Sequence, residues 1–340
     1  MSLTILVTGG AGYIGSHTCL VLQQAGFNVV VIDNLSNSSR ESLKRVESIT
    51  GKPVTFYEMD LLDEDGLDKV FKTNRINAVI HFAGLKAVGE SVSIPLKYYE
   101  NNISGTLSLL KVMQENEVRR MVFSSSATVY GMNNVSPLKE DMPLSATNPY
   151  GRTKLMIEEI LEDLYHSEPG WHISRLRYFN PIGAHESGLI GEDPNGVPNN
   201  LMPYVTQVAI GRLAELQVYG DDYETHDGTG VRDYIHVMDL AEGHVKAIGK
   251  VLSPEDALST YNLGTGIGYS VLDLISTYEA VNGTPIPYKI AGRRPGDIGT
   301  CYADAEKAYE ELNWKTSRSL EDMCRDSWKW QKMNPSGFNE

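Results

Sequence analysis

The sequence contains few cysteines and no long apolar run, and each of these absences excludes a class of protein. Its 340 residues include only Cys19, Cys301 and Cys324, which are far apart and odd in number. A disulfide framework and a CxxC metal or redox pair are therefore excluded. No apolar run reaches the roughly 18 residues that a membrane helix needs. The chain also enters a strand pattern at once, without a basic and apolar leader, so we expect a cytoplasmic protein.

The sequence also lacks an excess of basic residues. It contains 30 Lys and Arg against 44 Asp and Glu, a net charge of −14. Such a charge repels a phosphate polymer, and no Lys/Arg block forms a basic stripe, so we expect no nucleic-acid partner. A small anionic ligand is still allowed, because a few local arginines outweigh the global charge at short range. Length and composition predict a globular chain of two domains.

The first third of the chain alternates strand-like and helix-like segments. The run "LTILVTG" is a short strand, "SHTCLVLQQAG" has helical apolar spacing, and "NVVVID" is a second buried strand. Further strands are expected in "VTFYEMD", "NAVIHFAG" and "RRMVFSSSA". Near-continuous apolar strands with intervening helices are typical of a parallel sheet covered on both faces. We predict an α/β fold, a Rossmann-type doubly wound parallel sheet, with a smaller mixed α/β substrate domain.

The first turn carries "GGAGYIG", in which Gly10, Gly12 and Gly15 satisfy G-x-G-x-x-G and Gly9 extends the repeat. Glycines allow a tight turn and a close approach to a pyrophosphate, which then lies on the free N–H groups of the helix start. Asp33 ends the second strand 18 residues later, where a carboxylate accepts from both ribose hydroxyls and repels a 2′-phosphate. We predict a dinucleotide site that prefers NAD to NADP. For the turn alone, a glycine-rich loop without a ligand is the simpler alternative.

A second pattern, "NPYGRTK", begins with a good N-cap, Asn148, and a good first helical residue, Pro149. Tyr150 and Lys154 then share one face of a helix. Such a pair is expected about once by chance in this chain, so alone it proves nothing. Upstream, "VFSSSATVYG" places Ser126 at the carboxyl edge of a strand, where ligands bind in such sheets. Simple turn chemistry is the alternative for the serines alone.

In this order the motifs resemble the extended short-chain dehydrogenase/reductase superfamily, with its Ser/Tyr/Lys catalytic set. Together with "HFAGLKAVGES", "RYFNPIGAH", "DGTGVRDYIHV", "YNLGTGIGYSV" and "RRPGDIGTCYAD", they resemble the UDP-glucose/UDP-galactose 4-epimerase family over nearly the whole chain. That family interconverts two UDP-hexoses through a 4-keto intermediate, with NAD that it retains. The resemblance implies the same reaction here, with Ser126, Tyr150 and Lys154 as catalytic residues. It also implies a homodimer formed through helices near 93–116 and 149–165.

The resemblance further implies two sets of binding residues, and no metal. The NAD cofactor is expected to contact Gly9, Gly12, Tyr13, Ile14, Gly15, Asp33, Asn34, Ser36, Asn37, Ser38, Asp60, Leu61, Phe82, Ala83, Gly84, Lys86, Asn101, Ser126, Tyr150, Lys154 and Phe179. The UDP-hexose is expected to contact Lys86, Ser126, Tyr150, Tyr178, Asn180, Asn199, Asn200, Leu201, Gln217, Tyr219, Arg232, Arg294, Asp297 and Cys301. Arg232 and Arg294 are expected to donate two hydrogen bonds each to phosphate oxygens and to offset the negative charge of the diphosphate. For each arginine, a surface salt bridge is the alternative.

The resemblance also implies how the chain divides. Residues 1–180 form the NAD-binding domain, to which residues 233–264 return. Residues 181–232 and 265–340 form the UDP-sugar domain.

Three alternatives concern the reaction and its substrates. Related sugar 4,6-dehydratases carry an Asp-Glu pair where this chain has Ala127 and Thr128, so elimination lacks its general acid. A 4,6-dehydratase, a uronate 4-epimerase and a catalytically idle NAD-binding sensor are the alternatives to the epimerase. In the family, a bulky aromatic at the position of Cys301 restricts the sugar. The small cysteine therefore predicts activity on UDP-GlcNAc and UDP-GalNAc, although it also fits a space-filling role.

The tyrosine requires electrostatic help to act as a base. A free tyrosine has a pKa near 10, so a phenolate at neutral pH needs a shift of about three units. We expect three positive elements to supply it: the ammonium of Lys154, the nicotinamide and the N-terminus of the helix.

Overall fold

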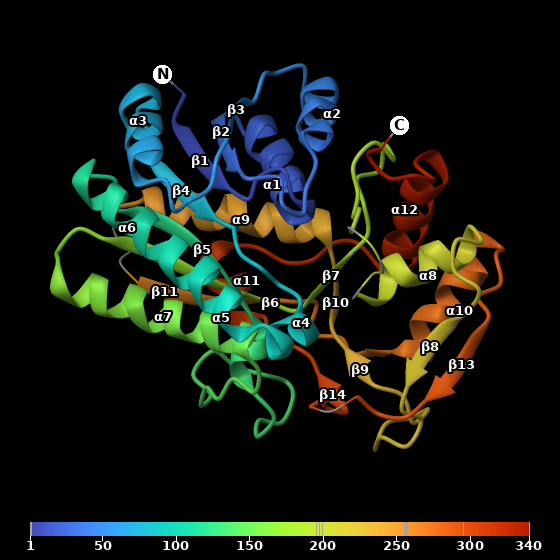
Figure 1. Cartoon of the computed structure of the whole chain (residues 1–340). Helices are drawn as coiled ribbons and strands as arrows, with labels where there is room; N and C mark the ends of the chain where they lie inside the picture. The colour runs from blue at the N-terminus through green and yellow to red at the C-terminus, as the bar shows by residue number, and fades with distance from the viewer. Residues whose placement is uncertain are drawn as a thin grey trace. The chain divides into compact units, whose positions relative to one another are not determined.

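The computed structural model describes residues 2–194, 196, 198, 200–254, 258–294 and 296–339. Two compact units make up the chain (Figure 1). The first contains residues 1–131, 143–177 and 241–261, and the second contains residues 132–142, 178–240 and 262–340. This division differs from the expected one mainly at residues 132–142, which pair with residues near 302 in the second unit.

A seven-stranded sheet forms the centre of the first unit, in the order β11-β6-β5-β4-β1-β2-β3 (Figure 1). Its strands are β1 (Thr4–Thr8), β2 (Asn28–Asp33), β3 (Thr55–Glu58), β4 (Ala78–His81), β5 (Arg120–Ser126), β6 (His172–Tyr178) and β11 (Leu258–Leu263). The pairs β3-β2, β2-β1, β1-β4 and β4-β5 are parallel. The order reverses between β1 and β4, the position at which such sheets bind ligands beyond their carboxyl ends. The predicted Rossmann-type fold is confirmed.

Helices connect these strands and cover the sheet. They are α1 (Tyr13–Gln24), α2 (Arg40–Thr50), α3 (Glu64–Asn74), α4 (Val88–Ser93), α5 (Pro95–Tyr99), the π-helical η1 (Glu100–Ser104), α6 (Gly105–Glu115), the 3-10 turn η2 (Ala127–Tyr130), α7 (Pro149–Ser167) and α9 (Val237–Leu252). The start of α7 is as predicted, because Asn148 accepts a hydrogen bond from the Gly151 N–H and Pro149 occupies the first turn. The apolar side of the sheet packs on these helices through Leu6, Phe123 and Leu161, all fully buried.

The second unit is a smaller mixed α/β structure. Its elements are β7 (Asn180–Ile182), α8 (Leu201–Ala209), β8 (Leu216–Tyr219), β9 (Val231–Arg232), β10 (Tyr234–His236), β12 (Tyr269–Ser270), α10 (Val271–Asn282), β13 (Tyr288–Ala291), β14 (Thr300–Cys301), α11 (Glu306–Leu312) and α12 (Leu320–Met333). Its strands form three short sheets, β10-β7, β12-β9-β14 and β13-β8. Helix α12 packs on α8 and α10 around a core that includes Val205, Leu274 and Met323.

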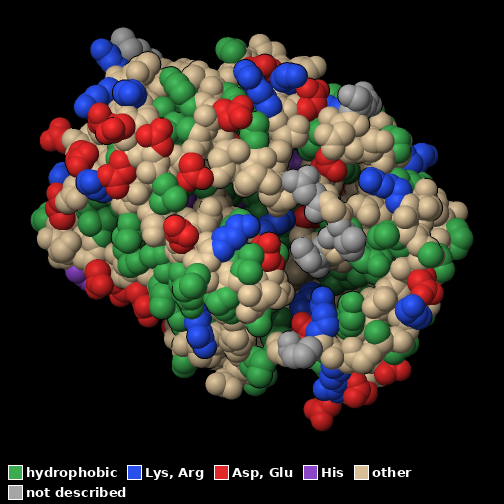
Figure 2. All heavy atoms as spheres, viewed as in Figure 1, with side chains coloured by type: hydrophobic (Ala, Val, Ile, Leu, Met, Phe, Trp, Pro, Cys, Tyr) green, Lys and Arg blue, Asp and Glu red, His purple; other side chains and the backbone are tan. Residues whose placement is uncertain are grey.

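Charged side chains of both signs are interspersed over the face drawn in Figure 2. Within the described ranges, no helix is both long and apolar enough to cross a membrane.

Candidate active site

Ser126 and Tyr150 lie together at the carboxyl edge of the sheet. Ser126 ends β5, and its hydroxyl caps the following 3-10 turn by accepting hydrogen bonds from the N–H of Thr128, at 3.2 Å, and from the Thr128 hydroxyl, at 3.0 Å. The Tyr150 side chain, half-buried in the first turn of α7, is hydrogen-bonded to the same Ser126 hydroxyl. The structure therefore brings together two residues that are 24 positions apart in the sequence. A hydroxyl and a phenol in contact provide a path along which a proton moves.

Lys154 lies one helical turn after Tyr150 and is buried. Its Nζ donates a hydrogen bond to the carbonyl oxygen of Ser124 at 2.7 Å and lies 4.9 Å from the centre of the Phe123 ring. Burial lowers the pKa of Lys154 to about 8, and the negative charge of Glu158 opposes this shift. Lys154 is therefore mainly an ammonium at neutral pH, but it changes charge within the range in which enzymes are assayed.

The pKa of Tyr150 differs from what the spacing predicts. Burial raises this pKa, and the hydrogen bond with Ser126 only partly offsets the rise. The phenolate loses hydration when the ring is buried. The Lys154 ammonium, meanwhile, is directed at the Ser124 carbonyl. In the protein alone, Lys154 and the helix N-terminus therefore do not offset the effect of burial on the pKa of Tyr150. The predicted lowering by all three positive elements, the nicotinamide included, stays a prediction for the protein with its cofactor bound.

The glycine-rich turn between β1 and α1 has the shape that a dinucleotide requires. A Cβ at Gly9, whose φ is +69°, would lie 2.8 Å from the Ala83 nitrogen, and one at Gly15 would lie 2.3 Å from the Gly9 carbonyl oxygen. The N-cap position of α1 is Gly12, which has no side chain that could occupy the space at the helix start. Free N–H groups at a helix start favour a phosphate. The residues present therefore fit the pyrophosphate of the expected cofactor.

Asp33, at the end of β2, accepts hydrogen bonds from its own chain that the sequence did not predict. One carboxylate oxygen accepts from the Ala11 N–H at 3.0 Å, and the other accepts from the Leu35 N–H at 2.9 Å and the Ser38 hydroxyl at 2.8 Å. A carboxylate offers about four acceptor positions, so three are already used by the chain. Asp33 therefore holds the glycine turn against the next loop, and a ribose would meet a carboxylate that is already oriented.

The other residues expected near the cofactor lie mostly at the same edge. Asn34 donates to the Asp60 carboxylate at 2.7 Å and accepts from the Ser36 N–H at 3.1 Å, which joins three residues expected around the adenosine. Tyr13 and Ile14 start α1, Asn37 is exposed, Leu61 is buried, Phe82, Ala83, Gly84 and Lys86 follow β4, and Asn101 lies in η1. Phe179 belongs to the second unit.

In the second unit, the two predicted diphosphate arginines lie around one carboxylate. Arg294 donates to Asp297 at 2.9 Å, and a nitrogen of Arg232 lies 3.9 Å from the other Asp297 oxygen. The Arg294 guanidinium also lies 4.8 Å from the centre of the Tyr219 ring, whose hydroxyl donates to Gln217 at 3.1 Å. All five side chains were expected to contact the UDP moiety. Two positive charges against one negative charge leave a local excess that suits a diphosphate.

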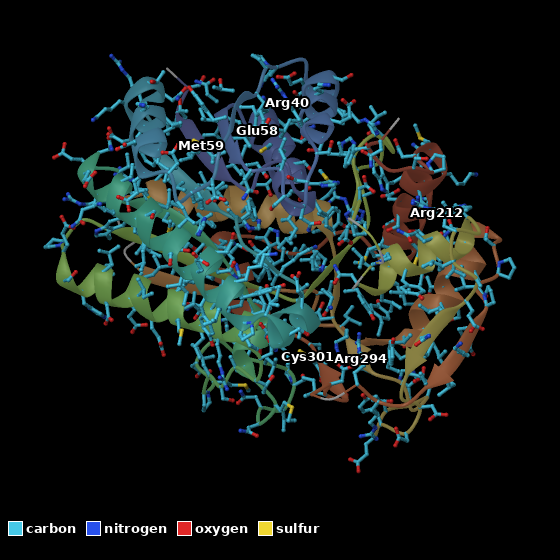
Figure 3. The ribbon with its side chains drawn as sticks, in the orientation of Figure 1. Arg40, Glu58, Met59, Arg212, Arg294 and Cys301 are labelled. Carbon is cyan, nitrogen blue, oxygen red and sulfur yellow. The ribbon has the colours of Figure 1, made fainter. Side chains whose placement is uncertain are left out.

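The remaining residues expected at the substrate are distributed over the same unit. Cys301 in β14 is paired in register with Arg232 in β9, and both Cys301 and Arg294 are labelled near these strands in Figure 3. Burial raises the pKa of the Cys301 thiol to about 11, so the thiol is neutral at physiological pH. Tyr178 is buried, Asn180 begins β7, and Asn200 and Leu201 begin α8, whereas Asn199 lies outside the described residues.

A buried ionic network, which begins at Glu158 one helical turn after Lys154, was not predicted from the sequence. Glu158 accepts from Arg177 at 3.0 and 2.7 Å and from the Ser125 hydroxyl. Arg177 in turn donates to the Tyr130 hydroxyl at 3.0 Å. The available signals were a glutamate among the apolar positions of α7 and an arginine within the apolar strand β6.

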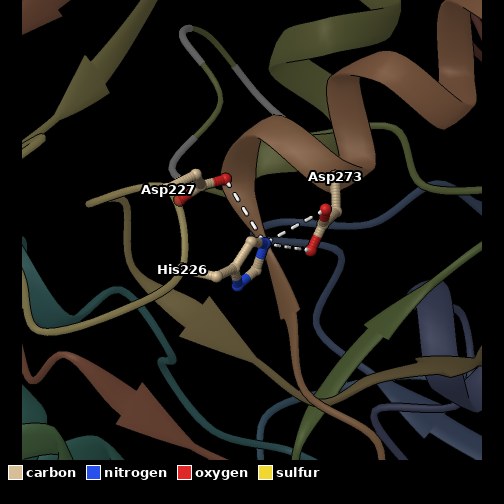
Figure 4. Close-up of side chains that lie close together, drawn as sticks. All are labelled: His226, Asp227 and Asp273. Atoms are coloured by element: carbon tan, nitrogen blue, oxygen red, sulfur yellow. Dashed lines mark hydrogen bonds and ion pairs between the residues drawn. The ribbon is translucent and has the colours of Figure 1, made fainter.

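A second group of titratable residues, His226, Asp227 and Asp273, lies in the second unit (Figure 4). Its ligand-type atoms lie within 4.8 Å of one another. The carboxylates, however, already serve the start of α10, because Asp273 accepts from the Ser270 N–H at 2.9 Å and Asp227 accepts from the Ser270 hydroxyl at 2.5 Å. We interpret the group as a helix cap, to which His226 adds an ion pair when protonated.

Comparison with known proteins agrees with this geometry. Residues 6–327 match a protein-family model described as GDP-mannose 4,6 dehydratase. The UDP-glucose 4-epimerase of Bacillus subtilis (strain 168) is 63% identical over 336 residues, which cover 99% of each chain. The chain belongs to the UDP-glucose 4-epimerase family. The resemblance inferred from the motifs is thereby confirmed.

Solved structures of the epimerase family have the same fold. The UDP-glucose 4-epimerase from Bifidobacterium longum, in complex with NAD+ and UDP, is 57% identical with a TM-score of 0.95, over 98% of this chain and 99% of that one. The enzyme from Stenotrophomonas maltophila, with bound NAD and formylated UDP-arabinopyranose, is 52% identical with a TM-score of 0.96, over the same shares.

The dehydratase description of the family model does not extend to the site itself. Ala127 and Thr128 begin η2 directly after Ser126, and neither has a carboxylate. The Thr128 hydroxyl donates to Ser126 instead. Thus the position at which a dehydratase holds its acid is used here to orient the serine, as suits an epimerase.

Proposed function

We propose that the chain interconverts UDP-galactose and UDP-glucose by NAD-dependent 4-epimerisation through a 4-keto intermediate, with Tyr150 as the base. The observation that carries the proposal is the hydrogen-bonded pair of Ser126 and Tyr150, beside the buried Lys154, at the carboxyl edge of a Rossmann sheet. A general base must lie within hydrogen-bonding reach of the group that it serves, and this pair offers such a contact for the sugar 4′-hydroxyl.

NAD, when bound, supplies the chemistry of hydride acceptance and return at carbon 4′. Gly9, Gly12 and Gly15 would hold its pyrophosphate, and Asp33 its ribose. Tyr150 takes the proton of the 4′-hydroxyl while Ser126 holds the same oxygen. The 4-keto sugar then turns in the pocket, so that its opposite face is the one that is reduced. Tyr150 returns the proton to the 4′-oxygen, and the configuration at carbon 4′ is inverted.

Two features favour isomerisation over net elimination. Neither Ala127 nor Thr128 is an acid, so nothing at these positions expels water from the 4-keto sugar. Arg232 and Arg294, grouped around Asp297, are suited to hold the diphosphate while the sugar turns about its linkage. The 4-keto sugar is then reduced on its opposite face, and it does not lose water.

The test is turnover without added cofactor. The purified protein is incubated with UDP-galactose alone, and products are followed by proton NMR. Formation of UDP-glucose is expected, because the family retains its NAD. A 4-keto-6-deoxy product would replace the proposal with a dehydratase, and a protein that retains NAD without any turnover would replace it with a cofactor sensor.

A second substrate pair follows from Cys301. Its half-buried side chain in β14 is small and uncharged and lies in register with Arg232, so the proposed hexose position has no bulky aromatic there. We expect turnover of UDP-GlcNAc and UDP-GalNAc. Cys301→Tyr should keep activity on UDP-galactose and lose it on the N-acetyl sugars. A Cys301→Tyr enzyme that still epimerised UDP-GlcNAc would contradict this assignment.

A homodimer is supported by apolar side chains exposed on α4 to α7. Val92 is 64% exposed and Leu96 is 81% exposed, and Leu107 and Met156 add to this surface on α6 and α7. Both α4 and α5 pack on α7, so these residues belong to one region of the first unit. Large exposed apolar areas mark contact sites. Light scattering should give twice the chain mass, and Leu96→Glu should lower it; a monomeric wild type at micromolar concentration would refute the dimer.

A cytoplasmic location is supported by the thiols. Cys19, Cys301 and Cys324 are all free in the structure, as is usual in a reducing compartment. Cell fractionation with antibody detection tests this, and recovery in a membrane or extracellular fraction would contradict it.

A further inference from the structure

The ionic network that begins at Glu158 contains two buried charges, those of Glu158 and Arg177. The carboxylate of Glu158 accepts from Nε of Arg177 at 3.0 Å and from Nη2 at 2.7 Å, so the pair is bidentate. Glu158 is 1% exposed and Arg177 is 3% exposed. The hydroxyl of Ser125 donates to the same carboxylate. Every oxygen of Glu158 therefore has a partner, and its position is fixed from α7, β5 and β6 at once.

This network reaches the proposed catalytic residues along two routes. On α7, Glu158 lies one turn after Lys154, on the same helix face. On β5, Ser125 lies between Ser124, whose carbonyl accepts from the Lys154 ammonium at 2.7 Å, and Ser126, which hydrogen-bonds Tyr150. A shift of the carboxylate would thus move the strand end and change the charge environment of Lys154 together.

Arg177 closes the network on its far side. Its Nη1 donates to the hydroxyl of Tyr130 at 3.0 Å, and its guanidinium lies 5.0 Å from the centre of that ring. Tyr130 is fully buried and ends η2, the turn that Ser126 caps at its start. The turn carrying the serine is consequently held at both ends.

A buried ion pair is a poor way to gain stability, because desolvating two charges offsets much of their attraction. Well-packed apolar side chains would fill this space as well. The links of Glu158 to Lys154 along α7 and to the neighbour of Ser126 on β5 therefore point to a task in the reaction.

Resting on the proposed roles of Tyr150, Lys154 and Ser126, we propose that Glu158 is a positioning residue which, held by Arg177 and Ser125, keeps Lys154 in its ammonium form and fixes Ser126 against the tyrosine.

Among the groups around Lys154, Glu158 is the one that can stabilise the ammonium by its charge. On β5, the Lys154 ammonium contacts the Phe123 ring and the Ser124 carbonyl. From β4 it faces His81, whose pKa burial lowers to about 3, so that imidazole is neutral. Tyr150 on its own helix is a phenol in the protein alone, since burial raises its pKa. Glu158 is the group whose negative charge raises the pKa of Lys154, against the effect of burial.

The experiment compares pH profiles of kcat and KM for UDP-galactose in the NAD-containing enzyme. Glu158→Gln removes the charge, Glu158→Asp keeps it, and Glu162→Gln is the matched control. Glu162 lies one turn further along α7 and pairs with Arg175 of the same strand β6 at 2.9 Å, but on the surface. Removing an opposite charge at close range shifts a pKa by about one unit or more.

The alkaline limb of kcat should therefore move to lower pH by about one unit in Glu158→Gln, a loss of about tenfold above that limb, with KM little changed. Glu158→Asp should restore the limb, and Glu162→Gln should leave it in place. A Glu158→Gln limb that coincides with that of the wild type, with only the absolute rate or the melting temperature lowered, would overturn the proposal and leave Glu158 a structural residue.

Two further measurements keep the inference falsifiable. If Glu158→Gln does not fold, Ser125→Ala removes one hydrogen bond to the carboxylate and should shift the limb in the same direction by a smaller amount. In 15N-lysine-labelled protein, the Lys154 signal, identified by its loss in Lys154→Met, should titrate at lower pH in the variant than in the wild type. This readout needs no turnover, so an inactive wild type would refute the proposed function alone, and an unshifted Lys154 titration would refute the inference alone.

Discussion

Lys154 should make the stability of the protein depend on pH in a way that one substitution removes. Burial lowers its pKa from 10.5 to about 8 in the folded chain, while the unfolded chain keeps the ordinary value. Between these two pH values the unfolded state binds more protons than the folded state. Stability contributed by this group therefore rises as pH increases through this window. Below pH 8 both states are protonated, and the burial penalty on the ammonium is fully present.

The size of the effect follows from the two pKa values. Integrating proton binding from pH 7 to pH 9.5 gives a gain of about 2 kcal/mol for the wild type, which Lys154→Met should not show. The other titrating groups contribute nearly equally to both proteins, so they cancel in the difference. Solvent screening of this charge is slight, because Lys154 is only 5% exposed.

Urea unfolding followed by circular dichroism at pH 7 and pH 9.5 measures this difference. Wild type minus variant should become more favourable by about 2 kcal/mol at the higher pH. Lys72→Met is the control, because Lys72 lies on the surface of α3 beside Asp68, which raises its pKa. A difference between wild type and Lys154→Met that is constant with pH would refute the assignment of a buried, depressed lysine.

Three other substitutions test the site. Tyr150→Phe should lower kcat by about 100-fold or more and keep NAD and UDP binding, which calorimetry and absorbance report; full activity would remove the tyrosine from the mechanism. Gly15→Ala brings a Cβ to 2.3 Å from the Gly9 carbonyl, so the purified variant should contain little NAD, whereas Gly89→Ala in the open surroundings of α4 should retain it. Arg294→Met should weaken UDP binding in calorimetry by about tenfold or more, while its neighbour Arg293, which pairs with Asp222 at 2.6 Å, serves as control; equal losses would place Arg294 outside the site.

Local patterns predict much of this site from the sequence. The glycine turn needs only a strand, a tight turn and a helix start, and these are encoded by adjacent residues. The same holds for Tyr150 and Lys154, because their spacing on a capped helix places them on one face before any long-range contact forms. The alternation of apolar strands and helices likewise predicts the parallel sheet.

What the sequence did not predict depends on burial and on contacts between distant segments. The Lys154 ammonium bonds to the carbonyl of Ser124, 30 residues away, and a backbone acceptor leaves no mark in a sequence. Glu158 and Arg177 meet only because α7 packs over β5 and β6. Asp33 uses three acceptor positions for its own loops, which its spacing from Gly15 does not reveal.

The direction of the Tyr150 pKa shift changes how the base must arise. In the protein alone the phenol is favoured by burial, and the Ser126 hydrogen bond offsets this only in part. The ammonium of Lys154, with its pKa near 8, is itself disfavoured by burial and sustained by Glu158. A positive charge bound close to the ring is then required before the phenolate becomes the preferred form. If Tyr150 is the base, as proposed, its base strength is therefore coupled to occupancy of the dinucleotide site, and a chain without its oxidant would also lack its base.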